Sequence, residues 1–266
     1  MLIALGFQSL VNAQSYESRE GDSITPRFYI GAGFFFPNID TALRIDSSIG
    51  IGTEINLEDD LKLDENIQVF KFGALVKISP RSQLLAGFTA IDRSQTLTLE
   101  ENIEVGDTIF YAGSNARIKF DVNYFALTWR YSFFNEKNWN AGLSFGARVM
   151  DINSSFNALL NDDSYFVEEG IIAPAVLFGI HGSAYLRPRL LARYSLEYLY
   201  LDIKGIDITI LESTATVSYF IFKNVGLGLG YSTNNYRLRN IPLSDDFDGK
   251  VIFGFGGFNL YITARF

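Results

Sequence analysis

The sequence contains no cysteine, one histidine, two tryptophans and two methionines among its 266 residues. Without cysteine, the chain can form neither a disulfide framework nor a thiolate nucleophile. No run approaches the roughly 20 apolar residues of a membrane-spanning helix, although 48% of the residues are hydrophobic. The net charge of -8 argues against a nucleic-acid partner. Aromatic residues are abundant instead, with 24 Phe and 14 Tyr, as is typical of β-strands and of membrane-interface girdles.

The chain divides into two short N-terminal segments and one large domain. Residues 1–13 form a short apolar run that ends in the small-residue pattern Val11-Asn12-Ala13. This pattern predicts a remnant secretory signal peptide that lacks its basic front end and is cleaved after Ala13; a misassigned N-terminus is the alternative. Residues 14–26 are polar and are expected to be a flexible lead. No Pro/Ser-rich linker interrupts residues 27–266, which we interpret as a single domain.

Period-two alternation of apolar and polar residues predicts long β-strands, and no segment has a convincing helical period. The connections between the strands alternate between tight turns and longer loops. The ten expected strands are residues 27–36, 67–78, 83–99, 116–133, 139–155, 171–186, 189–203, 207–222, 225–238 and 250–266. The longer loops are expected near residues 37–66, 100–115, 156–170 and 239–249, with a short connection near 203–206 as the exception.

Short turns on one side and long loops on the other are the pattern of outer-membrane barrels, in which both termini lie on the periplasmic side. The sequence therefore predicts an all-β protein, a closed antiparallel transmembrane β-barrel of about ten strands, with eight to twelve possible. Residues 39–58 could add a hairpin or extend the first pair of strands.

The two faces of the expected strands differ in composition. In the last strand, Phe258, Leu260, Ile262, Ala264 and Phe266 share one face, and Asn259, Tyr261, Thr263 and Arg265 share the other. The remaining strands likewise combine an apolar face with a face of Gly, Ser, Thr, Arg and Glu. A soluble sandwich would need a second sheet layer to bury the apolar face. A barrel with lipid outside and a polar lumen inside explains both faces, and glycine leaves room in a narrow cylinder.

Several stretches resemble a family of proteobacterial outer-membrane β-barrel proteins that is largely uncharacterised. They are residues 52–64 (GTEINLEDDLKLD), 91–94 (IDRS), 106–113 (GDTIFYAG), 225–231 (VGLGLGY) and 260–266 (LYITARF). The resemblance implies a barrel in the outer membrane, and it implies that the terminal Phe266 is part of the signal read by the barrel-assembly machinery. It implies no substrate and no catalytic residues. Lys62 stands where the family has glycine, at an expected tight turn.

Charged residues on the expected lumen faces form the main candidate site. A buried charge is costly unless it is paired and hydrogen-bonded. We therefore expect a charge network that plugs the lumen, because small barrels are filled by side chains. A selective pore lined by arginines is the alternative. The residues of the expected network are Arg130, Arg148, Arg193, Glu197, Glu212 and Arg265.

His181 and Ser183 are the best candidates for enzymatic chemistry, because they share a face and Glu197 lies on the next expected strand. A His–Ser–Glu set could arrange a nucleophile, a base and an orienting carboxylate, as in a lipid A deacylase. These residues should point into the barrel and away from lipid, so a lumen histidine and serine are the favoured interpretation. An omptin-type protease fits less well, because residue 179, two before His181, is glycine. Gly226, Gly228 and Gly230 are interpreted as space-saving lumen residues and not as a nucleotide loop.

Acidic residues gather in two expected outer loops. Clustered carboxylates can hold Ca²⁺ or Mg²⁺, but the spacing does not match an EF-hand, and a solvated acidic rim is favoured. We therefore predict no metal site and no cofactor. The residues are Asp40, Asp46, Glu54, Glu58, Asp59, Asp60, Asp64, Glu65, Glu100, Glu101, Glu104 and Asp107.

Together these features predict a monomeric protein of the cell outer membrane that is not an enzyme. Its expected function is structural, or that of a narrow, mostly plugged channel with a charged lumen. A pore for small or hydrophobic solutes is the alternative, and a membrane-embedded lipid hydrolase is a weaker one. The expected partners are outer-membrane lipid, lipopolysaccharide and the barrel-assembly machinery.

Overall fold

The computed structural model describes residues 24, 26–45, 54–64, 67–100, 102–105, 108–160, 163–203, 206–244 and 247–266. The expected signal segment 1–13 lies outside the described residues, as does the expected lead except for Ile24 and Pro26. Within the described ranges, no helix is long and apolar enough to cross a membrane.

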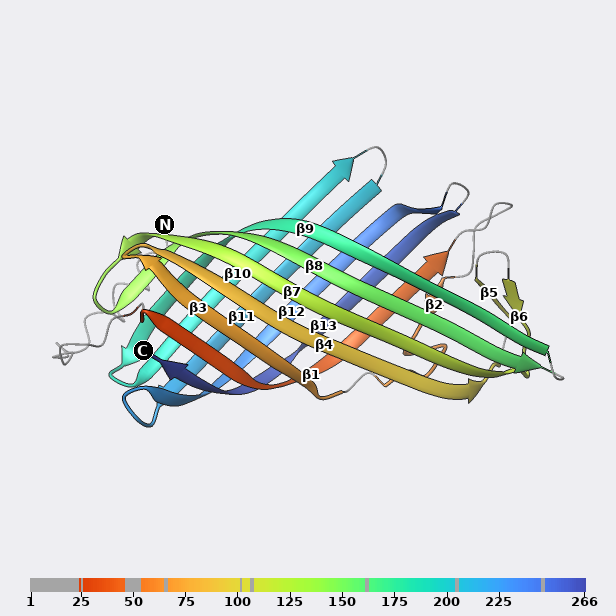
Figure 1. Ribbon diagram of the computed structural model, residues 1–266, viewed down its shortest axis with the longest axis horizontal. Helices are drawn as coiled ribbons and strands as arrows, with labels where there is room; N and C mark the ends of the chain where they lie inside the picture. The colour runs from red at the N-terminus through yellow and green to blue at the C-terminus, as the bar shows by residue number, and fades with distance from the viewer. Residues whose placement is uncertain are drawn as a thin grey trace, which may run out of the picture.

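Ten long antiparallel strands of the described chain form a closed barrel (Figure 1). The barrel closes where β1 pairs with β13, from Tyr29↔Arg265 to Ile45↔Gly249. This confirms the predicted all-β, closed antiparallel barrel of ten strands. The barrel strands are β1 (Phe28–Ile45), β3 (Val69–Ser79), β4 (Ser82–Thr98), β7 (Asn115–Asn135), β8 (Trp139–Leu160), β9 (Asp163–Arg187), β10 (Leu190–Ile203), β11 (Ile206–Phe220), β12 (Val225–Ser244) and β13 (Phe247–Arg265).

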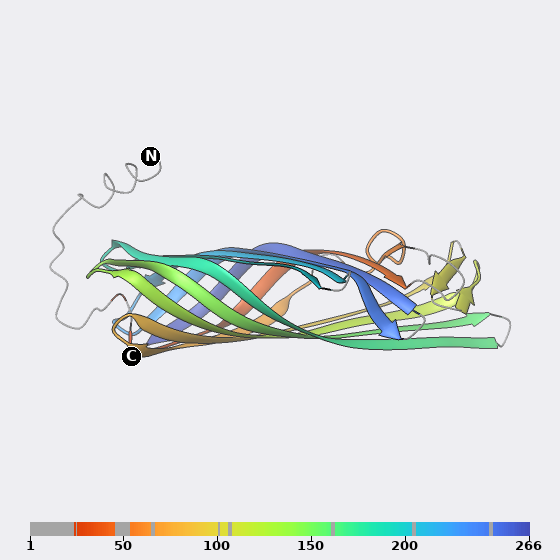
Figure 2. The ribbon, with the colours of Figure 1, turned by 90° about the horizontal axis from the view of Figure 1, so that it is seen from above.

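Three short strands lie outside the ten. β2 (Ile55–Asn56) pairs with the far part of β1, at Ala42↔Asn56 and Leu43↔Ile55. β5 (Ile103–Val105) and β6 (Thr108–Phe110) form a separate hairpin beyond the end of β4. The two views in Figures 1 and 2 place this hairpin and β2 at the end of the barrel opposite the C-terminus.

Two of the expected outer loops are largely strand. β8 continues to Leu160 and β9 begins at Asp163, so most of the loop expected at 156–170 is a long hairpin. β12 continues to Ser244 and β13 begins at Phe247, so most of the loop expected at 239–249 is also strand. Both loop predictions were wrong. In the second region the β12–β13 pairing shifts register between Leu238 and Ile241 and again between Pro242 and Ser244, which interrupts the period-two alternation that predicts a strand. The apolar and polar faces of the strands also reverse along the barrel, and the sequence analysis did not predict this reversal.

The reversal is plain along β12. The proximal half is the half of the barrel that contains the C-terminus and the short turns. The distal half is the other half. In the proximal half, β12 points Leu227, Leu229 and Tyr231 outward and glycines inward. In the distal half, it points polar residues such as Asn235 outward, while Tyr236 and Leu238 are buried inside. The same strand therefore exchanges its apolar and polar faces about halfway along.

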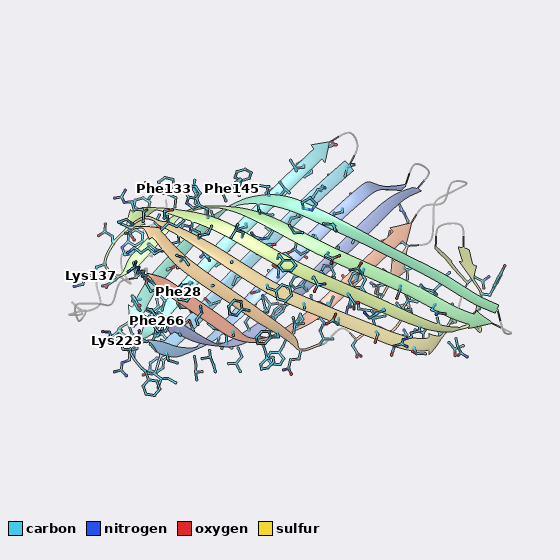
Figure 3. The ribbon with its side chains drawn as sticks, in the orientation of Figure 1. Phe28, Phe133, Lys137, Phe145, Lys223 and Phe266 are labelled. Carbon is cyan, nitrogen blue, oxygen red and sulfur yellow. The ribbon has the colours of Figure 1, made fainter. Side chains whose placement is uncertain are left out.

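An apolar belt surrounds the proximal half (Figure 3). Its large aromatic and aliphatic side chains project outward, and about half of the surface of each is exposed. Soluble monomers rarely expose apolar patches of this extent, so this surface faces an apolar medium or a partner. The belt includes Phe28, Phe34, Phe70, Phe72, Phe125, Leu127, Trp129, Phe133, Leu143, Phe145, Phe178, Ile180, Tyr194, Tyr219, Leu227, Leu229, Phe258, Leu260, Ile262 and Phe266.

The outside of the distal half is polar. On β4 and β7 the outward residues there include Asp92, Ser94, Arg117 and Lys119. Lys119 pairs with Asp121 two residues along the same face, and this hydrogen bond raises the pKa of the Lys119 ammonium group. A strand whose outer face contacts water is expected to carry polar and charged residues at every second position, as these strands do.

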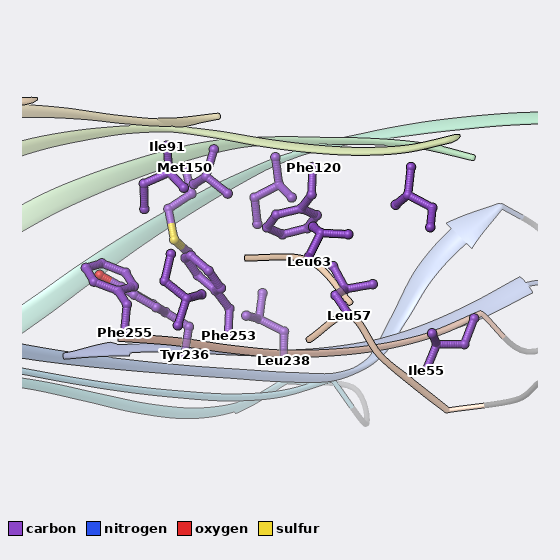
Figure 4. Packing of buried hydrophobic residues seen from close by; sticks show 14 of the residues in the cluster. Ile55, Leu57, Leu63, Ile91, Phe120, Met150, Tyr236, Leu238, Phe253 and Phe255 are labelled. Carbon is purple, nitrogen blue, oxygen red and sulfur yellow. The ribbon is translucent and has the colours of Figure 1, made fainter. Parts of the chain in front are cut away.

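The inside of the distal half is packed with apolar side chains, which we call the distal cluster (Figure 4). Its rings make close contacts, with centroids 5.8 Å apart for Phe120 and Phe253 and 6.0 Å apart for Tyr236 and Phe255. The expectation of a polar lumen is therefore wrong for this half. The largest fully buried members are Phe35, Ile39, Leu61, Ile91, Ile118, Phe120, Met150, Leu177, Tyr236 and Phe253.

A second, smaller apolar group lies inside the proximal end, and we call it the basal cluster. Ile24, which precedes β1, packs there against Tyr29, Leu75, Leu191 and Phe220. The polar part of the interior therefore lies between two apolar layers.

Candidate functional site

An arginine bridges two glutamates at the centre of the barrel interior. Arg148 on β8 forms ion pairs with Glu197 on β10 and with Glu212 on β11. Its Nη2 and Nε donate hydrogen bonds to Oε2 of Glu212 at 3.0 and 3.1 Å. Its Nη1 donates to Oγ1 of Thr128 at 2.9 Å. All three charged side chains are at least nine-tenths buried.

The sheet register makes this bridge necessary. Glu197 and Glu212 are direct partners in the β10–β11 pairing, and like charges directly opposite each other on one face repel. Arg148 reaches both carboxylates from β8 and neutralises one of the two charges. Hydroxyl groups complete the shell of Glu212, because Tyr124 and Tyr236 both donate to its Oε1, the latter at 2.7 Å.

Two glycines make room for these side chains. A Cβ on Gly146 would lie 2.5 Å from Nη1 of Arg148. A Cβ on Gly179 would lie 2.7 Å from Cγ of Glu197. Real Cβ atoms do not approach other atoms so closely, so glycine at these two positions allows the charged groups to meet inside a narrow barrel.

The other three arginines of the expected network lie elsewhere. Arg193 stacks over the ring of Tyr29, with its Cζ 3.8 Å from the centroid. Arg265 stacks over Phe220 at 3.8 Å and donates from Nε to the carbonyl oxygen of Lys223 at 2.9 Å. Arg130 faces inward, and its buried Nε has no hydrogen-bond partner within the described part of the chain. The structure thus joins Arg148, Glu197 and Glu212 in one ion-paired group, and the other three arginines form no ion pair with it within the described residues.

The alternative His–Ser–Glu arrangement, which the sequence analysis did not favour, is not assembled among these three residues. His181 is buried on the inner face of β9, and its Nε2 lies 3.2 Å from Oγ of Ser132 on β7. Ser183 pairs with Arg193 in the sheet register. Glu197 is held by Arg148 and so does not orient the imidazole.

A second buried ion pair lies in the distal half, and the sequence analysis did not predict it. Glu58 was assigned to the acidic rim, but it is buried and paired with Arg93 on β4. The Glu58 carboxylate also accepts the backbone N–H of Thr41 at 2.6 Å, and Arg93 donates to Oγ1 of Thr41 at 2.7 Å. The Arg93 guanidinium lies 5.1 Å from the ring centroid of Phe120. The inward parity of Arg93 on its strand was the signal that could have identified it.

Residues 54–64 fill a gap in the barrel wall, and we call them the mouth segment. β3 begins only at Val69, so the far parts of β1 and β4 have no β3 residues between them. The mouth segment occupies this position, with Leu57, Leu61 and Leu63 in the distal cluster. Figure 4 shows Leu57 and Leu63 pointing toward the rings of the distal interior. The conformation is held by the β2 pairing with β1 and by a Leu63 N–H bond to the carbonyl of Leu57 at 2.9 Å.

Lys62 makes the tight turn that the family resemblance places there. Its φ is +54°, the left-handed region that favours glycine. Its Nζ donates to the carbonyl oxygen of Asp59 at 2.5 Å, and its own carbonyl accepts from Nε2 of Gln95 at 3.2 Å. These bonds hold a strained residue in place.

Lys71 is a lumen cation that the sequence analysis did not single out. It pairs in register with Gly33 on β1, and its Nζ lies 4.4 Å from the ring centroid of Phe35. Its neighbours Phe70 and Phe72 both point outward, so parity along β3 was again the available signal. Within the described ranges, no group of three or more His, Asp or Glu side chains is placed to hold a metal ion.

Phe266 completes the barrel seam. Its backbone N–H donates to the carbonyl of Phe28 at 2.8 Å, and the N–H of Phe28 donates to the carbonyl of Phe266 at 3.0 Å. Its ring is exposed on the apolar belt near Phe28 (Figure 3).

Comparison with known proteins identifies the fold but no family. No protein-family model and no curated protein matches the chain. Among solved structures, the outer-membrane protease OmpT from Escherichia coli is similar at 11% identity, with a TM-score of 0.53, covering 96% of this chain and 99% of that one. Ail from Yersinia pestis matches at 13% identity and a TM-score of 0.32, covering 89% of this chain and 98% of that one. The Pseudomonas putida toluene transporter TodX matches at 8% identity and a TM-score of 0.31, covering 98% of this chain and 94% of that one. The match to OmpT shows that the closed barrel described above is a fold found in a bacterial outer-membrane protein.

Proposed function

We propose that this protein is a closed outer-membrane barrel whose proximal half spans the bilayer and whose distal half stands above the cell surface as a rigid structural platform. The observation that carries the proposal is the reversal of polarity along the same strands. The proximal half has an apolar exterior, as lipid requires, and the distal half has a polar exterior over an apolar interior, as a water-exposed domain requires.

The interior supports a closed barrel over an open channel. From the proximal end outward, it contains the basal cluster, the Arg148–Glu197–Glu212 bridge and the distal cluster, where Glu58 of the mouth segment pairs with Arg93. Side chains fill small barrels in this way, whereas open aqueous channels occur in larger ones. The plug is therefore mainly apolar, with the charged bridge as one of its layers.

A structural role without catalysis fits the surroundings of the candidate residues. His181 contacts Ser132 inside the barrel, and Glu197 is committed to Arg148. Neither group faces lipid or the surface. The protein has no assembled nucleophile, base and orienting carboxylate in these positions.

The apolar belt defines the expected partners. Outer-membrane lipid and lipopolysaccharide would surround the belt of a monomeric barrel, whose closed seam leaves no free strand edge for a second copy to extend. The exposed ring of Phe266 on the final strand is available as the assembly signal for the barrel-assembly machinery.

Planar-bilayer conductance of the refolded protein tests the closed state. We expect no steady current steps from the parent protein. Steady steps of constant size would contradict the proposal and favour an aqueous pore. Surface labelling of intact cells tests the orientation: a cysteine at Asn153, on the distal exterior, should react with an impermeant reagent, and a cysteine at Leu143, in the belt, should not.

A second candidate function is uptake of hydrophobic solutes, and the aromatic distal interior favours it. Phe35, Tyr236 and Phe253 line this interior, and the mouth segment covers it, held by Glu58. If this were the function, Glu58→Gln should loosen the segment and increase binding of an apolar fluorescent probe such as N-phenylnaphthylamine. Unchanged probe binding in Glu58→Gln and in the parent would leave the structural platform as the function.

A further inference from the structure

The polar section of the interior carries more positive than negative charge. This section lies between the basal and distal clusters. Four cationic side chains face into it, from Lys71, Arg130, Arg148 and Arg193, and within the described residues only the carboxylates of Glu197 and Glu212 oppose them. Arg148 is ion-paired with both carboxylates, and Oε1 of Glu197 is left without a hydrogen-bond partner in the described chain. The section therefore has an excess of two positive charges.

Arg130 is the group with the least compensation. Its Nε is buried without a hydrogen-bond partner in the described part of the chain. Arg148 and Arg193 lie close enough to repel it, and Glu197 is close enough to attract it without an ion-pair contact. No carboxylate oxygen of a described residue lies within 4.0 Å of its guanidinium.

A second unpartnered donor lies beside Arg130. Ser144 on β8 is its direct partner in the β7–β8 register. The Ser144 side chain is buried, and its Oγ has no hydrogen-bond partner in the described chain. One cation and one hydroxyl donor therefore face the same interior space with free hydrogen-bonding capacity.

Uncompensated buried charge is unfavourable, because it loses hydration without gaining a partner. Arginine side chains and hydroxyl groups together bind oxyanions well, since guanidinium N–H groups match two oxygens of a phosphate or sulfate group. A bound oxyanion with one to two negative charges would neutralise most or all of the excess positive charge in this section.

We propose that the polar section is a binding site for one small inorganic oxyanion, of the phosphate or sulfate class, held by Arg130 and Arg193 with Ser144 as a hydroxyl donor. The ligand is a free ion and not a lipid headgroup. The basal cluster lies between the polar section and the proximal end of the barrel, and a lipid entering from that end would have to place its acyl chains among the side chains of this cluster. The proposal goes beyond the structural role, and it does not depend on it. A conducting barrel could bind the ion, and a closed barrel could lack it.

Equilibrium dialysis tests the site directly. The full chain, refolded in detergent without lipid, is dialysed against radiolabelled inorganic phosphate at constant ionic strength. We expect saturable binding of about one ion per barrel, displaced by unlabelled sulfate but not by chloride. Arg130→Gln and Arg193→Gln should each weaken binding about tenfold, as loss of one charge-assisted hydrogen bond implies. Ser144→Ala should weaken it less.

The control is Arg117→Gln, which removes a cation from the distal exterior and should bind phosphate as the parent does. A second measurement separates binding from folding. Phosphate should raise the urea midpoint of the parent but not of Arg130→Gln. Without oxyanion, Arg130→Gln should be at least as stable as the parent, because the change removes a repelled charge.

Three results would overturn the proposal. The first is a parent that binds no phosphate above chloride. The second is equal binding by Arg130→Gln and Arg117→Gln. The third is an Arg130→Gln variant that is less stable than the parent yet keeps the full phosphate response.

Discussion

The proximal and distal halves of the barrel are built from the same strands with opposite polarity. On β7, Phe125 and Trp129 project outward in the proximal half, while Phe120 and Ile118 are buried inward in the distal half. The strand direction, pairing and parity do not change between the two. What changes is the polarity of the side chains on each side of the wall.

The comparison shows that one β-strand can carry its apolar residues on the outer face in one half and on the inner face in the other, as the surroundings of each half require. In lipid, the outer face must be apolar and the interior can hold charges that pair with one another. In water, the outer face must be polar and the interior must supply the hydrophobic core. The point at which the pattern reverses therefore marks the level at which the proposed bilayer ends.

Arg148→Ala should produce the largest loss and tests the proximal interior. It would leave Glu197 and Glu212 buried opposite each other without their bridging cation. Removing one partner of a buried pair costs about 3–5 kcal/mol, measured here as the free energy of unfolding in urea. Glu197→Gln, which keeps the shape and relieves the repulsion, should lose less. Equal effects of the two changes would mean that the bridge is solvated.

Leu227→Arg tests the proximal exterior. A charge at mid-belt should destabilise the barrel by about 2–4 kcal/mol in lipid vesicles. The matched control is Asn235→Arg on the same face of β12, in the distal half, where the new charge meets water and should have almost no effect. If the two changes were equally harmful, the belt would not be the lipid contact.

The tightness of packing inside the distal half and on the outside of the proximal half can be compared by removing one methyl group in each place. Ile91→Val, in the distal cluster, should destabilise the protein by about 0.5–1.5 kcal/mol, because a packed interior leaves a cavity. Ile262→Val, on the belt, should have a smaller effect, because mobile lipid chains can fill the space. Urea unfolding in the same vesicles compares them. A larger loss for Ile262→Val would show that the distal interior is loosely packed.

Lys62→Gly should change the free energy of unfolding least, and the change should be an increase. A non-glycine residue in the left-handed region is strained by about 1 kcal/mol. Glycine removes that strain but also removes the hydrogen bond from Nζ to Asp59. We expect a net stabilisation of up to about 1 kcal/mol in thermal or urea unfolding of the refolded protein. A loss in stability would show that the lysine contact matters more than the backbone strain.

Much of the fold was predictable because period two survives in every barrel strand. The alternation of Phe258, Leu260 and Ile262 with Asn259 and Tyr261 located the last strand and its faces correctly. The run Asn235-Tyr236-Arg237-Leu238 was also included in a predicted strand, but its apolar residues were not expected to lie inside the barrel. The extension of β12 beyond Leu238 was missed because two register shifts interrupt the alternation there.

The candidate site was less predictable, because it depends on register. Parity placed Arg148, Glu197 and Glu212 on inward faces, but only the pairing of β10 with β11 shows that the two glutamates lie opposite each other. The Glu58–Arg93 pair was missed for a different reason. Glu58 lies in an acidic stretch typical of a solvated loop, and its burial follows from the gap left by the short β3.

The seam between Phe28 and Phe266 has a kinetic consequence. The two residues that exchange backbone hydrogen bonds are separated by almost the whole described chain, so this seam can form only after Phe266 has been synthesised. Until then β1 and β13 present unpaired edges, which other chains can extend. Contacts at such sequence separation also form slowly. Both edges therefore stay open to pairing with other chains until the seam between Phe28 and Phe266 forms.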